Sequence, residues 1–240
     1  MSVYFSRLEY REEICEGTLA FACSQPSAFH FRAGQYVEIS LIAPKRRDIG
    51  GSSRSFSIAS APFENELLFI MRQSNSAFKQ ELGWLPLGSK IQISGAAGHF
   101  VLDEAPRRPA VFLAGGIGFA PCRSILRQAF HERSPRDIFL VYSNRRPEDA
   151  ACLGELRQFE KEHPNFRLTA TMTRMASSGA GWSGEQDPIN PMMLRRVVTG
   201  VCAPIYYIAG PSRFVTGMIS VLTALDVGEA DIRTEDFGEY

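Results

Sequence analysis

Two short stretches of the sequence carry residues that could bind a phosphorylated cofactor. In LAGGIGFAP, residues 113–121, Gly115, Gly116 and Gly118 follow an apolar run and precede a helical pattern. Glycines permit a tight turn and let backbone N–H groups approach a pyrophosphate at the positive end of a helix. Pro121 replaces the third glycine of G-x-G-x-x-G, and proline suits the first turn of a helix. A glycine turn that merely reverses the chain is the alternative.

The second stretch is RSFSIAS, residues 54–60, which combines an arginine, an aromatic ring and three serines. It lies just past a Gly-Gly turn, in a region that otherwise alternates like a sheet. A half-buried strand could carry these residues by chance, so their meaning depends on the elements that position them.

Residues 1 to about 104 have the pattern of short strands separated by turn signals. The predicted strands are VYFSRLEY, GTLAFACS, QYVEISLI, RSFSIAS, ELLFIMRQ, KIQISG and GHFVL, and one helical stretch, SAFKQELGWL, interrupts them. Regular short strands of this kind favour an antiparallel barrel or sandwich. We therefore predict an antiparallel β-barrel for the N-terminal domain, residues 1–104.

The pattern changes after the Pro- and charge-rich DEAPRRP. The apolar runs AVFLAGG, IFLVYSN, FRLTATMT and IYYIAG are typical of strands buried on both faces, and helix-length segments alternate with them. This alternation predicts an α/β doubly wound parallel sheet. We assign it to a second domain, residues 105–240.

Composition excludes several classes of partner. Lys plus Arg and Asp plus Glu both number 26 in 240 residues, so no net charge indicates nucleic acid or an anionic membrane. No apolar run approaches the roughly 20 residues of a membrane span. The N-terminus mixes acidic and basic residues, unlike a signal peptide, so we expect a cytoplasmic protein.

The cysteines and histidines do not predict a metal site. The spacing of the five cysteines fits neither zinc nor an iron–sulfur cluster, and no histidine pair has a helix-face metal spacing. We therefore expect reduced, buried thiols, which also suits a cytoplasmic location. The five are Cys15, Cys23, Cys122, Cys152 and Cys202.

In combination, these features resemble the ferredoxin–NADP reductase superfamily of flavoproteins. RSFSIAS resembles its flavin signature R-x-Y-S, and FRAGQYVEI resembles its early barrel strand. YIAGPSRFV resembles its late C-G-P-x-x-M/V segment, and DIRTEDF resembles its closing strand with E-x-F. The resemblance covers nearly the whole chain in the right order. It implies FAD in the barrel and a nicotinamide nucleotide on the α/β domain.

The resemblance also implies roles for individual residues. Arg54 would pair with the FAD pyrophosphate, which a guanidinium fork suits. Phe56 would lie against the isoalloxazine, and Ser57 would lie beside the flavin N5. Taken singly, Arg54 could be a surface arginine and Phe56 a core ring. Ser57 and Glu235 are the implied catalytic residues. Further implied cofactor contacts are Ser55, Arg72, Ser76, Gly115, Gly116, Gly118, Pro121, Gly210, Pro211, Phe237 and Tyr240.

Three positions depart from the family pattern or are ambiguous. Ser76 lacks the usual preceding glycine, so a plain helix N-cap is an alternative to a phosphate contact. Ala209 replaces a cysteine that helps to orient the nicotinamide, which implies a slower hydride step or a member that has lost catalysis. Either Tyr240, the last residue, or Phe237 could be the aromatic that covers the flavin.

Basic residues after the second and third parallel strands favour NADP over NAD. Ser143, Arg145 and Arg146 stand in YSNRRPED, and Thr173-Arg174 ends the next strand, where NADP-using relatives place a Ser/Thr-Arg pair. Such side chains could hold a 2′-phosphate, and no Asp or Glu directly ends the second strand to bind a ribose hydroxyl. An exposed basic loop is the alternative, and NAD remains possible.

These expectations together describe a flavin-dependent NAD(P)H oxidoreductase that passes electrons through FAD to an external acceptor. Ferredoxin, flavodoxin or free flavin are the expected acceptors, because the chain has no cluster cysteines and no haem-binding segment. A flavin-binding electron-transfer subunit that no longer oxidises nicotinamide is the first alternative. An alcohol-type dehydrogenase is the second, but it leaves the barrel and RSFSIAS unexplained.

Overall fold

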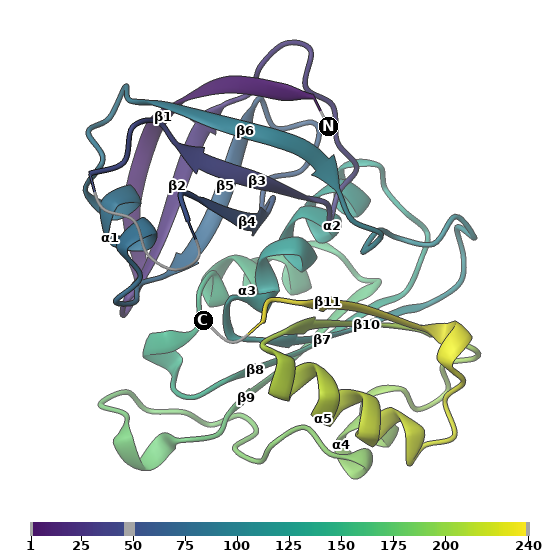
Figure 1. Cartoon of the computed structure of the whole chain (residues 1–240). Coiled ribbons are helices and arrows are strands. Elements are labelled where there is room, and N and C mark those ends of the chain that lie inside the picture. The colour runs from purple at the N-terminus through teal and green to yellow at the C-terminus, as the bar shows by residue number, and fades with distance from the viewer. Residues whose placement is uncertain (1, 46–50, 239–240) are drawn as a thin grey trace.

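The computed structural model describes residues 2–45 and 51–238 and arranges them around two sheets (Figure 1). The N-terminal sheet is antiparallel throughout, in the order β4-β3-β6-β1-β2-β5. Its strands are β1 (Val3–Cys15), β2 (Thr18–Ser24), β3 (Tyr36–Leu41), β4 (Ser53–Ser57), β5 (Glu66–Arg72) and β6 (Lys90–Ala97), and the helix α1 (Ala77–Trp84) connects β5 to β6.

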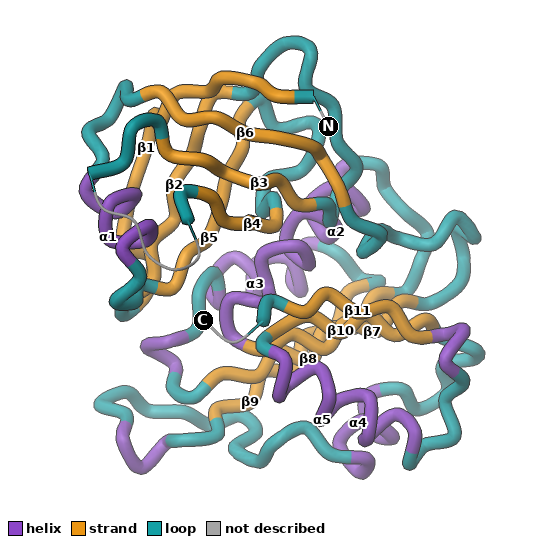
Figure 2. The backbone as a smooth tube through the Cα atoms, viewed as in Figure 1, coloured by secondary structure: helices purple, strands orange, loops and turns teal. Residues whose placement is uncertain are grey.

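The outer strands β4 and β5 meet, so the sheet closes into the predicted barrel (Figure 2). Just after β4, the Ala59 N–H donates to the Leu68 carbonyl at 2.7 Å, and the Leu68 N–H donates to the Ser60 hydroxyl at 3.0 Å. Aromatic rings fill the interior, where Phe21 and Phe69 stack with centroids 5.2 Å apart. The alternating strands of the sequence bury this one apolar face.

The predicted strand GHFVL is wrong, because residues 98–102 leave the barrel sheet. Phe100 is 1% exposed and packs in the core of the other domain, edge-on to Tyr207 at 5.7 Å. Burial of this ring against the parallel sheet therefore overrides a local strand pattern.

The C-terminal sheet is parallel, in the order β11-β10-β7-β8-β9, which confirms the doubly wound α/β prediction. The order reverses between β7 and β10, and open α/β sheets bind ligands at such a switch point, beyond the carboxyl ends of the strands. The strands are β7 (Ala110–Gly115), β8 (Ile138–Asn144), β9 (Phe166–Met172), β10 (Ile205–Gly210) and β11 (Ile232–Asp236).

Helices cover both faces of the parallel sheet (Figure 1). The helices α2 (Phe119–His131) and α3 (Leu153–Glu162) pack on the face nearer the barrel, and α4 (Pro191–Val197) and α5 (Ser212–Thr223) pack on the other. Four 3₁₀ turns complete the described elements: η1 (Gly116–Gly118), η2 (Pro147–Asp149), η3 (Met175–Ser177) and η4 (Glu229–Asp231).

Helix α2 also bonds to the barrel and so joins the two domains. Arg123 donates to the Ala59 carbonyl at 2.8 Å, and the Ser124 hydroxyl donates to the Ser60 carbonyl at 2.6 Å. The same Arg123 guanidinium forms a two-bond pair with Glu155 on α3, at 2.8 and 2.9 Å. These contacts hold α2, and with it the preceding glycine loop, against the segment that follows β4.

The segment between β6 and β7 connects the domains. Arg136 is 2% exposed, and its guanidinium donates to the carbonyl oxygens of Asp103, Ala105 and Arg108 in this segment. The residue at which one domain passes into the next, predicted at 104, stays a prediction. Within the described ranges, no helix has the length and apolar character that crossing a membrane requires.

Candidate functional site

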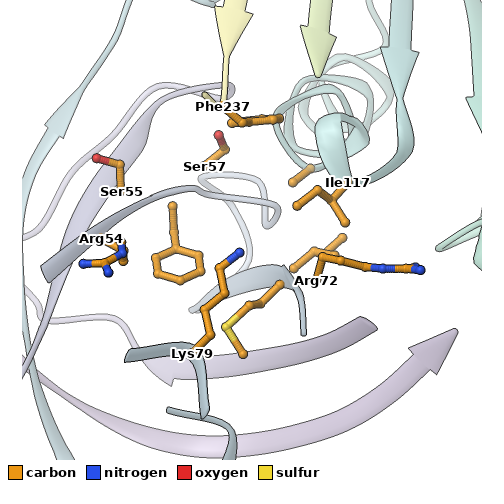
Figure 3. A pocket seen from close by; sticks show the side chains of 11 residues that line it. Arg54, Ser55, Ser57, Arg72, Lys79, Ile117 and Phe237 are labelled. Carbon is orange, nitrogen blue, oxygen red and sulfur yellow. The ribbon is translucent and has the colours of Figure 1, made fainter. Parts of the chain in front are cut away.

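A pocket lies where the barrel faces the glycine loop, at the switch point of the parallel sheet (Figure 3). Its walls come from β4, β5 and α1 of the barrel and from the glycine loop and the chain end of the α/β domain. The lining residues are Arg54, Ser55, Phe56, Ser57, Ile70, Met71, Arg72, Lys79, Ile117, Ala120 and Phe237. Among these described residues three are cationic and none is Asp or Glu, so the pocket suits an anionic ligand with an apolar part.

Arg54 and Phe56 are braced by one ring of α1. The Arg54 guanidinium lies over the Phe78 ring, 5.4 Å from its centroid, and donates to the Ser53 carbonyl at 2.7 Å. Phe56 is 7% exposed, with the centroids of Phe21 and Phe78 at 5.6 and 6.1 Å. Most of the Phe56 ring therefore packs in the barrel core, and only its remainder lines the pocket. Its contact with an isoalloxazine stays a prediction.

Ser57 and Glu235 meet across the domain interface. The Ser57 hydroxyl donates to the Glu235 carboxyl at 3.4 Å. Burial raises the pKa of Glu235 from 4.5 to about 7, and the bond from Ser57 opposes this rise. Glu235 reaches this place because β11 is the edge strand beside β10, where Glu235 pairs in register with Ala209. The pair can therefore hold or release a proton near neutral pH beside the pocket.

We predict that Glu235 makes stability fall as pH rises. A carboxyl whose pKa rises on folding binds more protons in the folded state between pH 4.5 and about 7, so the free energy of unfolding decreases through that window. Because Glu235 is partly exposed, we expect a reduced effect, in which the free energy of unfolding falls by about 2 kcal/mol. Glu235→Gln removes it, and urea unfolding at pH 5 and pH 8 measures the difference. Exposed Glu104→Gln controls for loss of one charge, and equal pH dependence in Glu235→Gln and wild type would contradict the prediction.

The glycines of the loop have separate tasks. Gly116 adopts φ +55°, a left-handed conformation that glycine accommodates without strain. A Cβ at Gly118 would lie 2.2 Å from the Ala209 carbonyl oxygen, so this glycine lets α2 approach β10 closely. The sequence predicts a tight turn and close approach to a pyrophosphate at all three glycines. The structure adds a packing role for Gly118, and its cofactor contact stays a prediction. Pro121 occupies the first turn of α2 as predicted.

Of the basic residues after β8 and β9, two lie together and one does not. The Arg174 N–H donates to the Arg145 carbonyl at 2.7 Å, and both side chains are exposed without an ion pair or hydrogen bond among the described residues. Arg146 instead pairs with Asp149 at 3.0 Å and with Glu16 of the barrel at 2.9 Å. Arg146, predicted with Arg145 as a contact for a 2′-phosphate, is therefore held instead in a bridge between the domains.

Arg72 and Ser143 also lie beside the site. Arg72 lines the pocket, but its guanidinium already donates to the Glu16 carbonyl at 3.0 Å and pairs with Asp149 at 3.3 Å. Hydrogen bonds from Arg146 first, and then from Arg72, lower the pKa of Asp149, against the effect of burial. Ser143, near the end of β8, pairs in register with Gly115 and so lies next to the glycine loop.

Of the remaining predicted cofactor contacts that the structure describes, some line the pocket and others do not. Ser76 stands at the N-cap position of α1, without a side-chain cap bond, and does not line the pocket, so its contact with a phosphate stays a prediction. The Gly210 carbonyl accepts the Phe237 N–H at 3.1 Å, and Pro211 precedes α5. Phe237 lines the pocket near Ser57 (Figure 3), whereas Tyr240 lies outside the described residues.

Five lining residues were missed from the sequence: Ile70, Met71, Lys79, Ile117 and Ala120. Ile117, inside the glycine loop, turns its side chain into the pocket (Figure 3). Lys79 lies on the buried face of α1 together with Phe78 and Leu82. A lysine at a helical spacing that is otherwise apolar is the signal that could have identified it. The departure at Ala209 is fully buried and does not line the pocket.

The thiols only partly match their expectation. Cys23 and Cys122 are buried, and burial raises the pKa of Cys23 to about 12. Cys15 and Cys152 are partly buried. Cys202 is exposed, so the expectation that every thiol is buried is wrong: it lies in the loop between α4 and β10, outside either core. The described residues contain no cluster of potential metal ligands.

Comparison with known proteins agrees with this arrangement. Residues 112–219 match the family described as "Oxidoreductase NAD-binding domain". The chain is 29% identical over 221 residues to ferredoxin–NADP reductase B of Sorangium cellulosum, covering 89% of this chain and 86% of that protein. It is 27% identical over 227 residues to the glycine betaine monooxygenase reductase subunit of Chromohalobacter salexigens, covering 92% of this chain but only 60% of that subunit.

The fold comparison covers the whole molecule. A ferredoxin NADP⁺ reductase from Neisseria gonorrhoeae, solved with bound FAD and NADP, superposes with a TM-score of 0.81 at 20% sequence identity. The match covers 98% of this chain and 99% of that one. The barrel and the parallel sheet therefore belong to a common two-domain fold.

Proposed function

Because this chain belongs to the ferredoxin–NADP reductase superfamily, we propose that it is a flavin-dependent NAD(P)H oxidoreductase that binds FAD in the pocket between the domains. The observation that carries the proposal is the set of side chains on that pocket. Cationic Arg54 and the hydroxyl of Ser57 stand on one strand, opposite the glycine loop and Phe237. The whole activity is inferred, since the chain spans about 60% of the betaine monooxygenase reductase subunit.

The described residues fit FAD. Cations without carboxylates in the lining suit a pyrophosphate, and Phe56, Ile117 and Phe237 offer apolar surface for a ring system. When bound, FAD accepts a hydride as an electron pair and can release the electrons singly. Ser57 would orient the reactive edge of the ring, and Glu235, whose pKa is about 7, would hold a proton there. Packing of α2 on the barrel would exclude water from this interface.

We further propose NADPH as the preferred electron donor, with NADH as a possible substitute. The exposed guanidinium groups of Arg145 and Arg174 are joined through their backbones at the carboxyl edge of the parallel sheet. Two cations at this edge suit a 2′-phosphate. The glycine loop after β7 would receive the shared pyrophosphate at the start of α2.

The acceptor is proposed to be a separate protein, such as a ferredoxin or a flavodoxin, with free flavin as a further candidate. Relatives named as a reductase subunit and as a ferredoxin reductase support this choice of partner class. A single series of measurements tests the proposal. Purified protein should be yellow and should bleach on anaerobic addition of NADPH, and less readily with NADH. Ferredoxin, flavodoxin and free flavin are then added in turn, and return of the colour identifies the acceptor class.

A flavin-binding subunit that no longer uses nicotinamide is the second candidate. Ala209 favours it, because a fully buried methyl group replaces the family cysteine. Protein that is yellow but is bleached by neither nucleotide would support this alternative. Colourless protein, with no flavin released on denaturation, would contradict both candidates.

We predict that Phe237→Ala changes the flavin absorption bands and tightens nicotinamide binding. An aromatic ring on the isoalloxazine contributes roughly 0.5–1.5 kcal/mol beyond burial, and nicotinamide must displace it. Removal should therefore tighten binding by about 2- to 10-fold. Deletion of Tyr240 is the companion variant. If that deletion alone changes the spectrum and the nicotinamide affinity, Tyr240 covers the flavin; if neither variant does, no aromatic at the chain end has this role.

A further inference from the structure

Lys79 has a charged side chain that is buried and lines the pocket. It is 8% exposed, although lysine is among the residues least often found inside a protein. Figure 3 shows its amine directed into the pocket from α1. Phe78 and Leu82 on the same face of α1 pack in the barrel core, so the backbone beneath Lys79 is firmly held. The chain therefore keeps a positive charge at a fixed place on the pocket wall.

The charges around Lys79 favour an anion in the pocket. Burial is the largest cause that lowers the pKa of Lys79, and the positive charge of Arg54 lowers it further. Arg54 is held close by, because its guanidinium lies over the ring of the adjacent Phe78. Arg72 adds a third cation to the lining, and the described lining residues include no carboxylate. An anion between Lys79 and Arg54 would offset the repulsion between the two cations.

The charge of Lys79 specifies the part of a ligand that it would meet. Lys79 and Arg54 both line the pocket, whereas Ser76 and Ala77 at the start of α1 do not. The two cationic side chains therefore attract negative charge to their part of the pocket. In FAD that charge resides on the pyrophosphate, whereas the oxidised ring system is neutral.

We propose that Lys79 is a second cationic ligand of the FAD pyrophosphate, acting beside Arg54. This rests on the proposed function and adds a residue that no sequence motif identified. The two cations are complementary, because a guanidinium fork fixes the orientation of phosphate oxygens and an ammonium group acts as a compact point charge. Lys79 would thereby hold the dinucleotide half of the cofactor and leave the reacting ring to Ser57.

The test compares two flavins on the full-length protein after flavin removal. Quenching of flavin fluorescence gives the dissociation constants of FAD and of riboflavin, which has no phosphate. Lys79→Met keeps much of the side-chain length and removes the charge. Loss of one charge-assisted contact should weaken FAD binding by about 10- to 100-fold. Riboflavin binding should not change, and Lys79→Arg should retain most of the FAD affinity. Exposed Lys90→Met on β6 is the matched control.

The outcomes separate this proposal from the proposed function. Equal weakening of FAD and riboflavin would move Lys79 to the ring system and overturn the proposal, as would unchanged affinity for both. Failure of the wild type to bind FAD would instead contradict the proposed function. If circular dichroism shows that Lys79→Met is unfolded, Lys79→Gln is measured in its place, and the same loss of FAD affinity without loss of riboflavin affinity is expected of it.

Discussion

Replacing Arg54 with alanine is expected to leave the purified protein mostly free of flavin. The guanidinium is positioned twice, by its bond to the Ser53 carbonyl at 2.7 Å and by its place over the Phe78 ring. A pre-positioned fork loses little side-chain entropy when it binds phosphate. A charge-assisted contact of this kind contributes roughly 1.5–3 kcal/mol, so we expect FAD affinity to fall by about 10- to 150-fold.

The flavin content of the purified variant, from the absorbance ratio of flavin to protein, measures this effect. Arg7→Ala is the matched control, because Arg7 is an exposed barrel arginine that likewise donates to a backbone carbonyl, that of Gly88 at 3.0 Å. Arg54→Lys keeps the charge without the fork and should retain intermediate occupancy. Wild-type occupancy in Arg54→Ala would remove Arg54 from the cofactor site.

Replacing Arg145 and Arg174 together is expected to abolish the preference for NADPH. Both guanidinium groups are exposed at the end of the parallel sheet, and the bond between their backbones holds the two loops together. The loss of two contacts to a 2′-phosphate should raise the KM for NADPH by about 10- to 100-fold, at the lower end of what charged hydrogen bonds contribute because the groups are solvated. The KM for NADH should hardly change, since NADH lacks this phosphate.

Arg146→Ala is the control for the double variant. Its side chain is joined to Asp149 and to Glu16 of the barrel, so this substitution should weaken the contact between the domains and leave the cofactor preference intact. Steady-state kinetics with both nucleotides distinguish these cases. If the double variant raises both KM values equally, the two arginines contact the shared pyrophosphate or the nucleotide does not bind there.

The sequence alone determined the two domains and most of their elements. Alternating short strands bury one face and continuous apolar strands bury two, so the antiparallel barrel and the parallel sheet differ in their local patterns. The glycine loop, Pro121 and RSFSIAS could likewise be identified from the sequence, because each is a pattern of adjacent residues. The local pattern predicted a strand wrongly at residues 98–102. There the ring of Phe100 packs in the core of the other domain and contacts Tyr207, which lies more than one hundred residues away in the sequence.

The partners that each side chain of the site contacts could be determined only from the folded structure. Arg146 follows Arg145 in the sequence, yet its side chain pairs with the Glu16 carboxylate of the barrel, whereas that of Arg145 does not. Ser57 and Glu235 meet only because α2 joins the barrel to the sheet, and burial at that contact raises the pKa of Glu235. Lys79 likewise lines a pocket only because the folded chain brings the two domains together. Periodicity is a property of adjacent residues, whereas charge pairing and desolvation depend on which distant segments the folded chain brings together.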